Sequence, residues 1–170
     1  MKKLLHILLS FCCSQVFAQD CSDIFISEYV EGTANNKAIE LYNPTNQPIH
    51  LSQYSLSRWS NGGLTPSTTQ LSGIIEAKST YVIIIDMRDP NGEGINLAVW
   101  NGYWNPVDQL NTDTVYDVSE DLQSLADTFI NPDYNVSNTM AFNGNDAITL
   151  EKGSDIIDIF GKVGEDPGVA

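Results

Sequence analysis

Residues 24–42 read IFISEYVEGTANNKAIELY, and this stretch predicts two neighbouring strands joined by a turn. Its first six residues are rich in the β-branched and aromatic side chains that favour strands. The GTANN segment in the middle is typical of a loop. In the last five residues, Ile39 and Leu41 fall on one face and Glu40 on the other, because side chains alternate along a strand. The pattern therefore predicts a strand pair with one apolar face.

The rest of the chain repeats this pattern of short strands and polar turns. Further strands are expected at residues 49–51, 54–59, 71–75, 80–86, 147–150 and 156–160. The run YVIII at residues 81–85 has no polar interruption, which predicts a strand buried on both faces. Short strands at hairpin spacing indicate an all-β fold, an antiparallel sandwich or barrel. The expected core residues are Ile24, Ile26, Ile39, Leu41, Leu56, Val82, Ile84, Ile148, Leu150 and Ile159.

One stretch, residues 87–141, does not fit the strand pattern and is too long for a plain loop in a compact domain. It is expected to be an insertion that carries one helix near residues 117–130. Apolar residues recur there at helical spacing, namely Leu122, Leu125, Ala126 and Phe129. Asp117 or Ser119 is the candidate N-cap. The apolar face of this helix is expected to cover the sandwich.

The first residues have the features of a secretory signal peptide. A pair of lysines precedes an apolar stretch at residues 4–13, and Ala18 ends the Val-Phe-Ala sequence of a cleavage site. We expect cleavage after Ala18, which divides the chain into a signal peptide, residues 1–18, and one domain, residues 19–170. No later apolar run is long enough to span a bilayer. The mature protein is therefore expected to be secreted, either extracellular or at the cell surface.

The composition favours a globular domain and argues against some classes of function. The 170 residues include 22 acidic and 8 basic side chains, for a net charge of −14, and 42% are hydrophobic. Residues 1–18 contain two of the basic residues and no acid, so the mature chain keeps six basic residues and a charge of −16. Direct nucleic-acid binding by this domain is not expected, since it needs clustered Lys and Arg. The mature chain keeps one histidine, His50, and one cysteine, Cys21, too few for a His/Cys zinc site.

Six segments of the mature chain carry a resemblance to a known family. They are residues 23–32 (DIFISEYVEG), 36–45 (NKAIELYNPT), 51–56 (LSQYSL), 78–84 (KSTYVII), 142–150 (FNGNDAITL) and 157–161 (IDIFG). As a set, in this order and spacing, they resemble the lamin tail domain family, specifically its exported bacterial branch. The resemblance implies an immunoglobulin-like antiparallel β-sandwich without catalytic machinery. The helical insertion departs from the minimal domain of that family.

The same resemblance implies that the domain is one part of a larger exported protein. Bacterial relatives accompany extracellular nucleases, phosphatases and adhesins, often with a C-terminal sorting domain. The sequence stops soon after the loop at residues 161–167, whereas similar sandwiches continue with another strand. Cys21 also has no partner cysteine in the mature chain. We therefore expect the domain to be incomplete at residue 170.

Three groups of residues are candidates for chemistry, and the first is the carboxylate set Glu28, Glu31 and Glu40. Acid–base catalysis needs two carboxyls held in a cleft with separated pKa values. The sequence supplies neither a nucleophile nor a set of oxyanion donors beside them. A solvated or turn-bonding role is therefore favoured, no catalytic residue is assigned, and the chain is not expected to be an enzyme.

The second group is an oxygen-rich loop that suits calcium, a cation with several oxygen ligands. Its candidate ligands are Asp86, Asp89, Asn91 and Glu93. The spacing departs from the EF-hand because Arg88 stands where an oxygen ligand is needed. Asp and Asn also favour turns by bonding their own backbone. Turn formation is therefore the alternative to calcium here and at residues 143–146, and no other cofactor is expected.

The third group is an aromatic loop with Trp100, Tyr103 and Trp104. Flat aromatic rings beside amide side chains are suited to a sugar or a peptide. The alternative is that these large side chains are buried and pin the insertion to the sandwich.

These observations favour a non-enzymatic extracellular binding or spacer module, the N-terminal part of a larger exported protein. Its partners would be a protein or polysaccharide surface and the neighbouring domains of the same chain. One alternative is an accessory domain of an extracellular nuclease or phosphatase whose catalytic domain lies beyond residue 170. A second alternative is a sugar-binding module that uses the aromatic loop.

Overall fold

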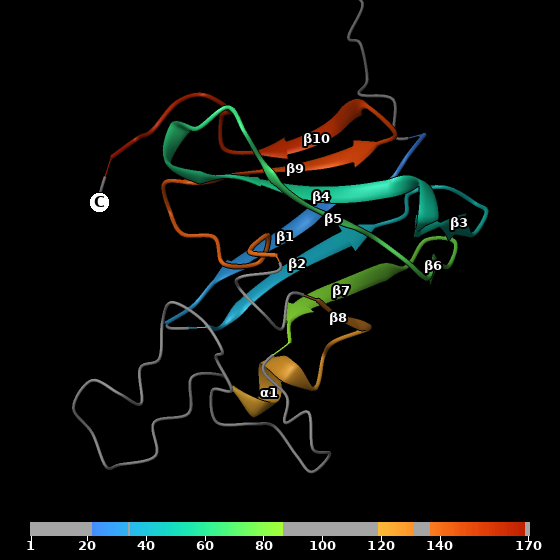
Figure 1. Ribbon diagram of the computed structural model, residues 1–170. Helices are drawn as coiled ribbons and strands as arrows, with labels where there is room; N and C mark the ends of the chain where they lie inside the picture. Colours follow the sequence, from blue (N-terminus) through green and yellow to red (C-terminus); the bar gives the residue numbers. More distant parts are fainter. Residues whose placement is uncertain (1–21, 34, 87–118, 131–136, 169–170) are drawn as a thin grey trace, which may run out of the picture.

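The computed structural model describes residues 22–33, 35–86, 119–130 and 137–168. Two four-stranded sheets lie one above the other as two layers (Figure 1), and a ribbon of two short strands lies at one end. The predicted β-sandwich is therefore confirmed. Among the described residues, no helix is long and apolar enough to cross a membrane.

The first sheet contains the strand pair predicted from residues 24–42. Its strands, in spatial order, are β1 (Phe25–Glu31), β2 (Lys37–Tyr42), β7 (Thr80–Ile85) and β8 (Thr128–Ile130). β1 pairs with β2 and β2 with β7 in antiparallel fashion, whereas β8 runs parallel to β7. The apolar strand β7 thus lies inside the sheet, with a neighbour on each side.

The second sheet is antiparallel throughout. Its strands, in spatial order, are β10 (Asp155–Phe160), β9 (Ala147–Lys152), β4 (Tyr54–Trp59) and β5 (Ser67–Gln70). The ribbon at the end of the sandwich consists of β3 (Ile49–His50) and β6 (Ile74–Ile75). Two short 3₁₀ turns, η1 (Leu51–Gln53) and η2 (Ser60–Gly62), flank β4.

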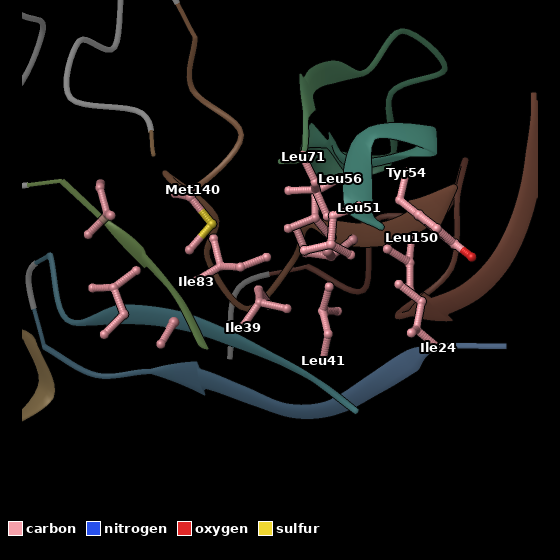
Figure 2. Close-up of a cluster of buried hydrophobic side chains, with 14 of the residues drawn as sticks. Ile24, Ile39, Leu41, Leu51, Tyr54, Leu56, Leu71, Ile83, Met140 and Leu150 are labelled. Atoms are coloured by element: carbon pink, nitrogen blue, oxygen red, sulfur yellow. The ribbon is translucent and has the colours of Figure 1, made fainter. Parts of the chain in front are cut away.

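The core lies between the two sheets, as Figure 2 shows for side chains from both layers. Most of the expected core residues are buried, namely Ile24, Ile39, Leu41, Leu56, Ile84, Ile148 and Leu150. In the run at residues 81–85, the last three isoleucines are fully buried, which confirms two-sided burial for that part of β7. Met140 and Phe142 also join the core, so the end of the expected insertion packs inside the sandwich.

One expected core position is wrong, since Ile159 is 43% exposed. Ile26 and Val82 are partly buried and pack against the core. Ile159 lies in β10, an edge strand, where the register shifts between Ile156 and Asp158. Such a bulge adds an unpaired residue and breaks the two-residue alternation on which the prediction relied.

The predicted helix is also wrong in length. Helix α1 spans only Glu120–Gln123, and the chain then forms strand β8 instead of a second turn of helix. Asp127 explains the change, because its backbone NH donates to the Val82 carbonyl at 2.9 Å and its carboxylate accepts the Val82 NH at 2.8 Å. These two bonds align the chain with β7, so pairing within the sheet overrides the helical pattern.

The prediction that the apolar face of this helix covers the sandwich is therefore only partly right. Leu122 packs partly buried against the core, Leu125 is 63% exposed, and Phe129 lies in β8 rather than on a helix. Ser119 caps α1 as predicted, since its hydroxyl accepts the NH of Leu122 at 3.4 Å. The other candidate cap, Asp117, lies outside the described residues, as does most of the insertion.

The burial of β7 yields a test of the core. Ile84 is 0% exposed, so Ile84→Ala is expected to lower the free energy of unfolding by about 2–5 kcal/mol, the cost of deleting buried aliphatic groups. Urea unfolding of the purified protein measures this. Ile74→Ala, at a 45% exposed position, is the matched control and should cost little. A cost below about 0.5 kcal/mol for Ile84→Ala would show that Ile84 is outside the core.

Candidate functional site

Two of the three groups singled out in the sequence lie largely outside the described residues. Trp100, Tyr103 and Trp104 of the aromatic loop are among the residues that the structure leaves undescribed, as are three of the calcium candidates, Asp89, Asn91 and Glu93. Asp86 is described, directly after β7, where its NH donates to the Ile130 carbonyl at 2.9 Å. In the described ranges, no group of three or more His, Cys, Asp or Glu side chains is arranged to hold a metal ion.

The carboxylate group of the sequence analysis lies on the β1–β2 pair. Glu28 and Glu40 stand opposite each other in the register. Glu40 accepts a hydrogen bond from the Ser27 hydroxyl at 2.7 Å. Glu31 accepts the Tyr29 hydroxyl at 2.9 Å and lies 3.6 Å from the Lys37 ammonium. Glu31 and Glu40 thus bond to side chains of the same strand pair, an arrangement of surface pairs rather than of an acid–base site.

The turn at residues 143–146 is held by a buried carboxylate. Asp146 is 6% exposed, and its two oxygens accept the backbone NH of Asn61 at 2.9 Å and of Asn143 at 3.1 Å. The Arg58 guanidinium lies 3.8 Å away and also donates to the Ala141 carbonyl. Because Asp146 joins two loops at one end of the sandwich, this turn has the structural role that was the alternative to calcium.

A second carboxylate joins the edges of the two sheets. Asp158 in β10 accepts the backbone NH of Ile26 in β1 at 2.7 Å and that of Ile159 at 2.9 Å. Both strands have a register shift at this point. The bond therefore occupies an edge NH group that would otherwise be free to pair with another chain.

A third carboxylate, Asp23, joins the start of β1 to the second sheet. It accepts the Tyr54 hydroxyl at 2.6 Å, the Lys152 ammonium at 2.7 Å and the Ile24 NH at 2.8 Å. Lys152 also lies 5.1 Å from the centre of the Tyr54 ring, within range of a cation–π contact. Burial raises the pKa of Asp23, but these hydrogen bonds and the charge of Lys152 outweigh it and leave the pKa below the ordinary 3.8.

An aromatic stack of Phe142, Tyr29 and Phe160 reaches from the core to the surface. Phe142 is buried, the Tyr29 ring centre lies 4.6 Å from that of Phe142, and the Phe160 ring centre lies 4.0 Å from that of Tyr29 with only 12° between the planes. Burial, followed by the hydrogen bond to Glu31, raises the pKa of Tyr29. Phe160 is the outer ring and is 45% exposed.

Phe160 lines a shallow pocket of about 210 Å³ at one end of the sandwich. The pocket, called the end pocket below, lies between the turn at residues 143–146 and the chain that follows β10. Asn145, Lys162 and Glu165 contribute its polar lining. No spacing rule in the sequence points to this site, because Tyr29 and Phe160 meet only through contact between the first and last strands.

In a comparison with protein families, the family model described as Lamin Tail Domain matches residues 18–164. No curated protein matches the chain. The matched residues include every strand of both sheets, so the family accounts for the observed immunoglobulin-like sandwich.

The buried ion pair predicts a large effect of Asp146. Asp146→Ala leaves Arg58 without its carboxylate in a site where both side chains are less than one-tenth exposed. We expect the free energy of unfolding to fall by about 3 kcal/mol or more, because an unpaired buried charge is costly. Urea unfolding measures the loss. Glu165→Ala, which breaks the exposed Lys162–Glu165 pair, is the control and should change stability little. Equal losses in the two variants would contradict a special role for Asp146.

The lowered pKa of Asp23 predicts a dependence on acid. A carboxylate whose pKa is lower in the folded state stabilises the fold above its unfolded pKa, and this contribution is lost as the pH falls through the folded pKa. Asp23→Asn should therefore lower the melting temperature at neutral pH, and the difference from the unmodified protein should shrink once the pH drops below 3.8. A difference that stays constant into this range would show that the charge of Asp23 contributes nothing.

Proposed function

Since this chain belongs to the lamin tail domain family, we propose that it is a non-enzymatic binding or spacer module of a larger exported protein. Family membership itself supports a non-catalytic, immunoglobulin-like module. The proposal adds a location outside the cell or on its surface, and a position beside further domains. It rests on the signal-peptide features of residues 1–18 and on the buried polar side chains that hold the loops of the fold.

The observation that carries the proposal is that two deeply buried polar side chains, Asn43 and Asp146, hold loops of the scaffold. Asn43 is fully buried and donates to three carbonyls, those of Gln47, Ile75 and Glu76, at 2.8–3.1 Å. Its side-chain oxygen accepts both the NH and the hydroxyl of Thr45. Asp146 also holds two loops, because its carboxylate accepts the backbone NH groups of Asn61 and Asn143. A scaffold with loops fixed in this way presents a constant surface, which suits binding or spacing.

The charge of the chain narrows the choice of partner. With 22 acidic against 8 basic residues, the surface repels phosphate-rich polymers, so a protein or an uncharged polysaccharide is the better partner. If the parent protein is a nuclease or phosphatase, this domain positions the catalytic domain and does not grip the substrate. That accessory role is a special case of the same module.

Export gives the direct test. The full chain, produced in a bacterial host, is expected to appear outside the cytoplasm with Gln19 as its first residue, because Ala18 meets the small-residue requirement of signal peptidase. N-terminal sequencing and mass spectrometry of the exported protein measure this. Ala18→Phe should block cleavage, whereas Ala18→Gly, the matched control, keeps a small residue and should be cleaved.

Two results would overturn the proposal. One is uncleaved protein that stays in the cytoplasm. The other is hydrolysis of DNA or p-nitrophenyl phosphate by the purified protein, if Glu28→Gln or Glu40→Gln abolishes that activity. The expected result is export, together with the same background rate in the protein and both variants.

A further inference from the structure

We propose that the end pocket binds a single uncharged sugar ring. The inference deepens the proposed function and rests on it, because it gives the binding module a class of ligand. It places this ligand on Phe160 and Asn145, at the end of the sandwich, rather than on the aromatic loop around Trp104.

The aromatic stack gives the pocket a rigid apolar wall. Phe160 lies almost parallel to Tyr29, which in turn packs on the buried ring of Phe142. The position of the exposed ring is therefore fixed by the core before any ligand arrives. One side of a pyranose ring is formed largely by C–H groups, and it packs against the electron-rich face of an aromatic ring. A wall that is already in place reduces the ordering cost of binding.

The polar lining supplies groups for the hydroxyl rim of a sugar. Asn145 donates to Asp166 through its side-chain nitrogen at 3.3 Å, and its carbonyl oxygen belongs to the same planar amide at the pocket wall. Lys162 and Glu165 add one donor and one acceptor group. An aromatic wall with a few polar groups is the usual composition of a small-molecule site.

The charges at the pocket are paired, which favours an uncharged ligand. Lys162 forms an ion pair with Glu165, and the buried Asp146 lies against Arg58. The pocket therefore offers no unpaired cation for a phosphate or an acidic sugar. The overall charge of −14 adds repulsion for anions.

The size of the pocket limits the ligand to one ring. Its volume is about 210 Å³, below the roughly 300–1,000 Å³ of sites for larger ligands. Gly161 keeps its floor close to the sheet, since a Cβ at this position would lie 3.2 Å from Ala147 Cα and φ is +87°. A ligand of this size on an open surface is expected to bind with an affinity on the order of 1 mM.

An extended peptide fits this region less well. Peptides that add to a sheet need a free strand edge. The Asp158 carboxylate already takes the Ile26 NH and joins the edges of β1 and β10 beside the pocket. We therefore argue for the sugar and treat a peptide as an outcome of the test.

The test is a titration of the ¹⁵N-labelled protein with the methyl glycosides of glucose, galactose, mannose and N-acetylglucosamine, followed by NMR. At least one glycoside should give saturable shifts confined to the amides of residues 144–146 and 160–165. Phe160→Ala should weaken binding at least tenfold, whereas Phe160→Tyr keeps the ring and should bind within threefold of the unmodified protein. Ile156→Ala is the matched control, because Ile156 is 50% exposed on the same strand and does not line the pocket.

A second variant covers the case in which Phe160→Ala loses its fold. Asn145→Ala removes a polar group from the opposite wall without touching the stack, and it too should weaken binding at least tenfold while the melting temperature stays close to that of the unmodified protein. The proposal is overturned if no glycoside shifts these amides at about 100 mM. It is also overturned if Ile156→Ala weakens binding as much as the pocket variants do, or if a short extended peptide, titrated in the same way, is the only probe that shifts these amides. None of these results bears on signal-peptide cleavage or hydrolysis, so the proposed function is judged separately.

Discussion

The rest of the structure depends on the two-sided burial of β7. Ile83, Ile84 and Ile85 are each fully buried, and a strand with apolar side chains on both faces needs apolar cover on both. The second sheet supplies one cover. Residues 119–130 supply more, since Leu122 and other apolar side chains of this segment pack against the same core. The later part of the expected insertion is thus a structural part of the sandwich and not an appendage to it.

Once the core is in place, carboxylates close its ends and edges. Asp23 ties the start of β1 to Lys152, Asp146 ties two loops to Arg58, and Asp158 ties β10 to Ile26. A strongly acidic chain would be expected to carry its charge on solvated faces. Here part of that charge accepts backbone NH groups that would otherwise lack partners at loops and strand edges. The acidic composition therefore contributes to the fold as well as to the repulsion of other anions.

The sequence predicts the parts of this fold that local pattern determines. The alternation at Ile39 and Leu41 identifies a strand with one apolar face, and the run at residues 81–85 identifies the buried centre of a sheet. The failures have non-local causes. Asp127 redirects a helical pattern into β8 because Val82 offers it two bonds, and a bulge in β10 leaves Ile159 exposed. Neither event leaves a mark in the spacing of the residues concerned.

The end pocket could not be predicted either, because its residues meet only through contacts between distant parts of the chain. The same contacts explain why the pocket suits a ligand. Phe160, at the end of the last strand, stacks on Tyr29 from the first, and Phe142 anchors both to the core. The opposite wall of the pocket is formed by the turn at residues 143–146, which directly follows Phe142 in the chain and is held by Asp146. Both walls are therefore held by contacts that form only in the folded domain. A ligand that bridges them binds the folded state and not the unfolded chain, so it must also stabilise the fold by mass action.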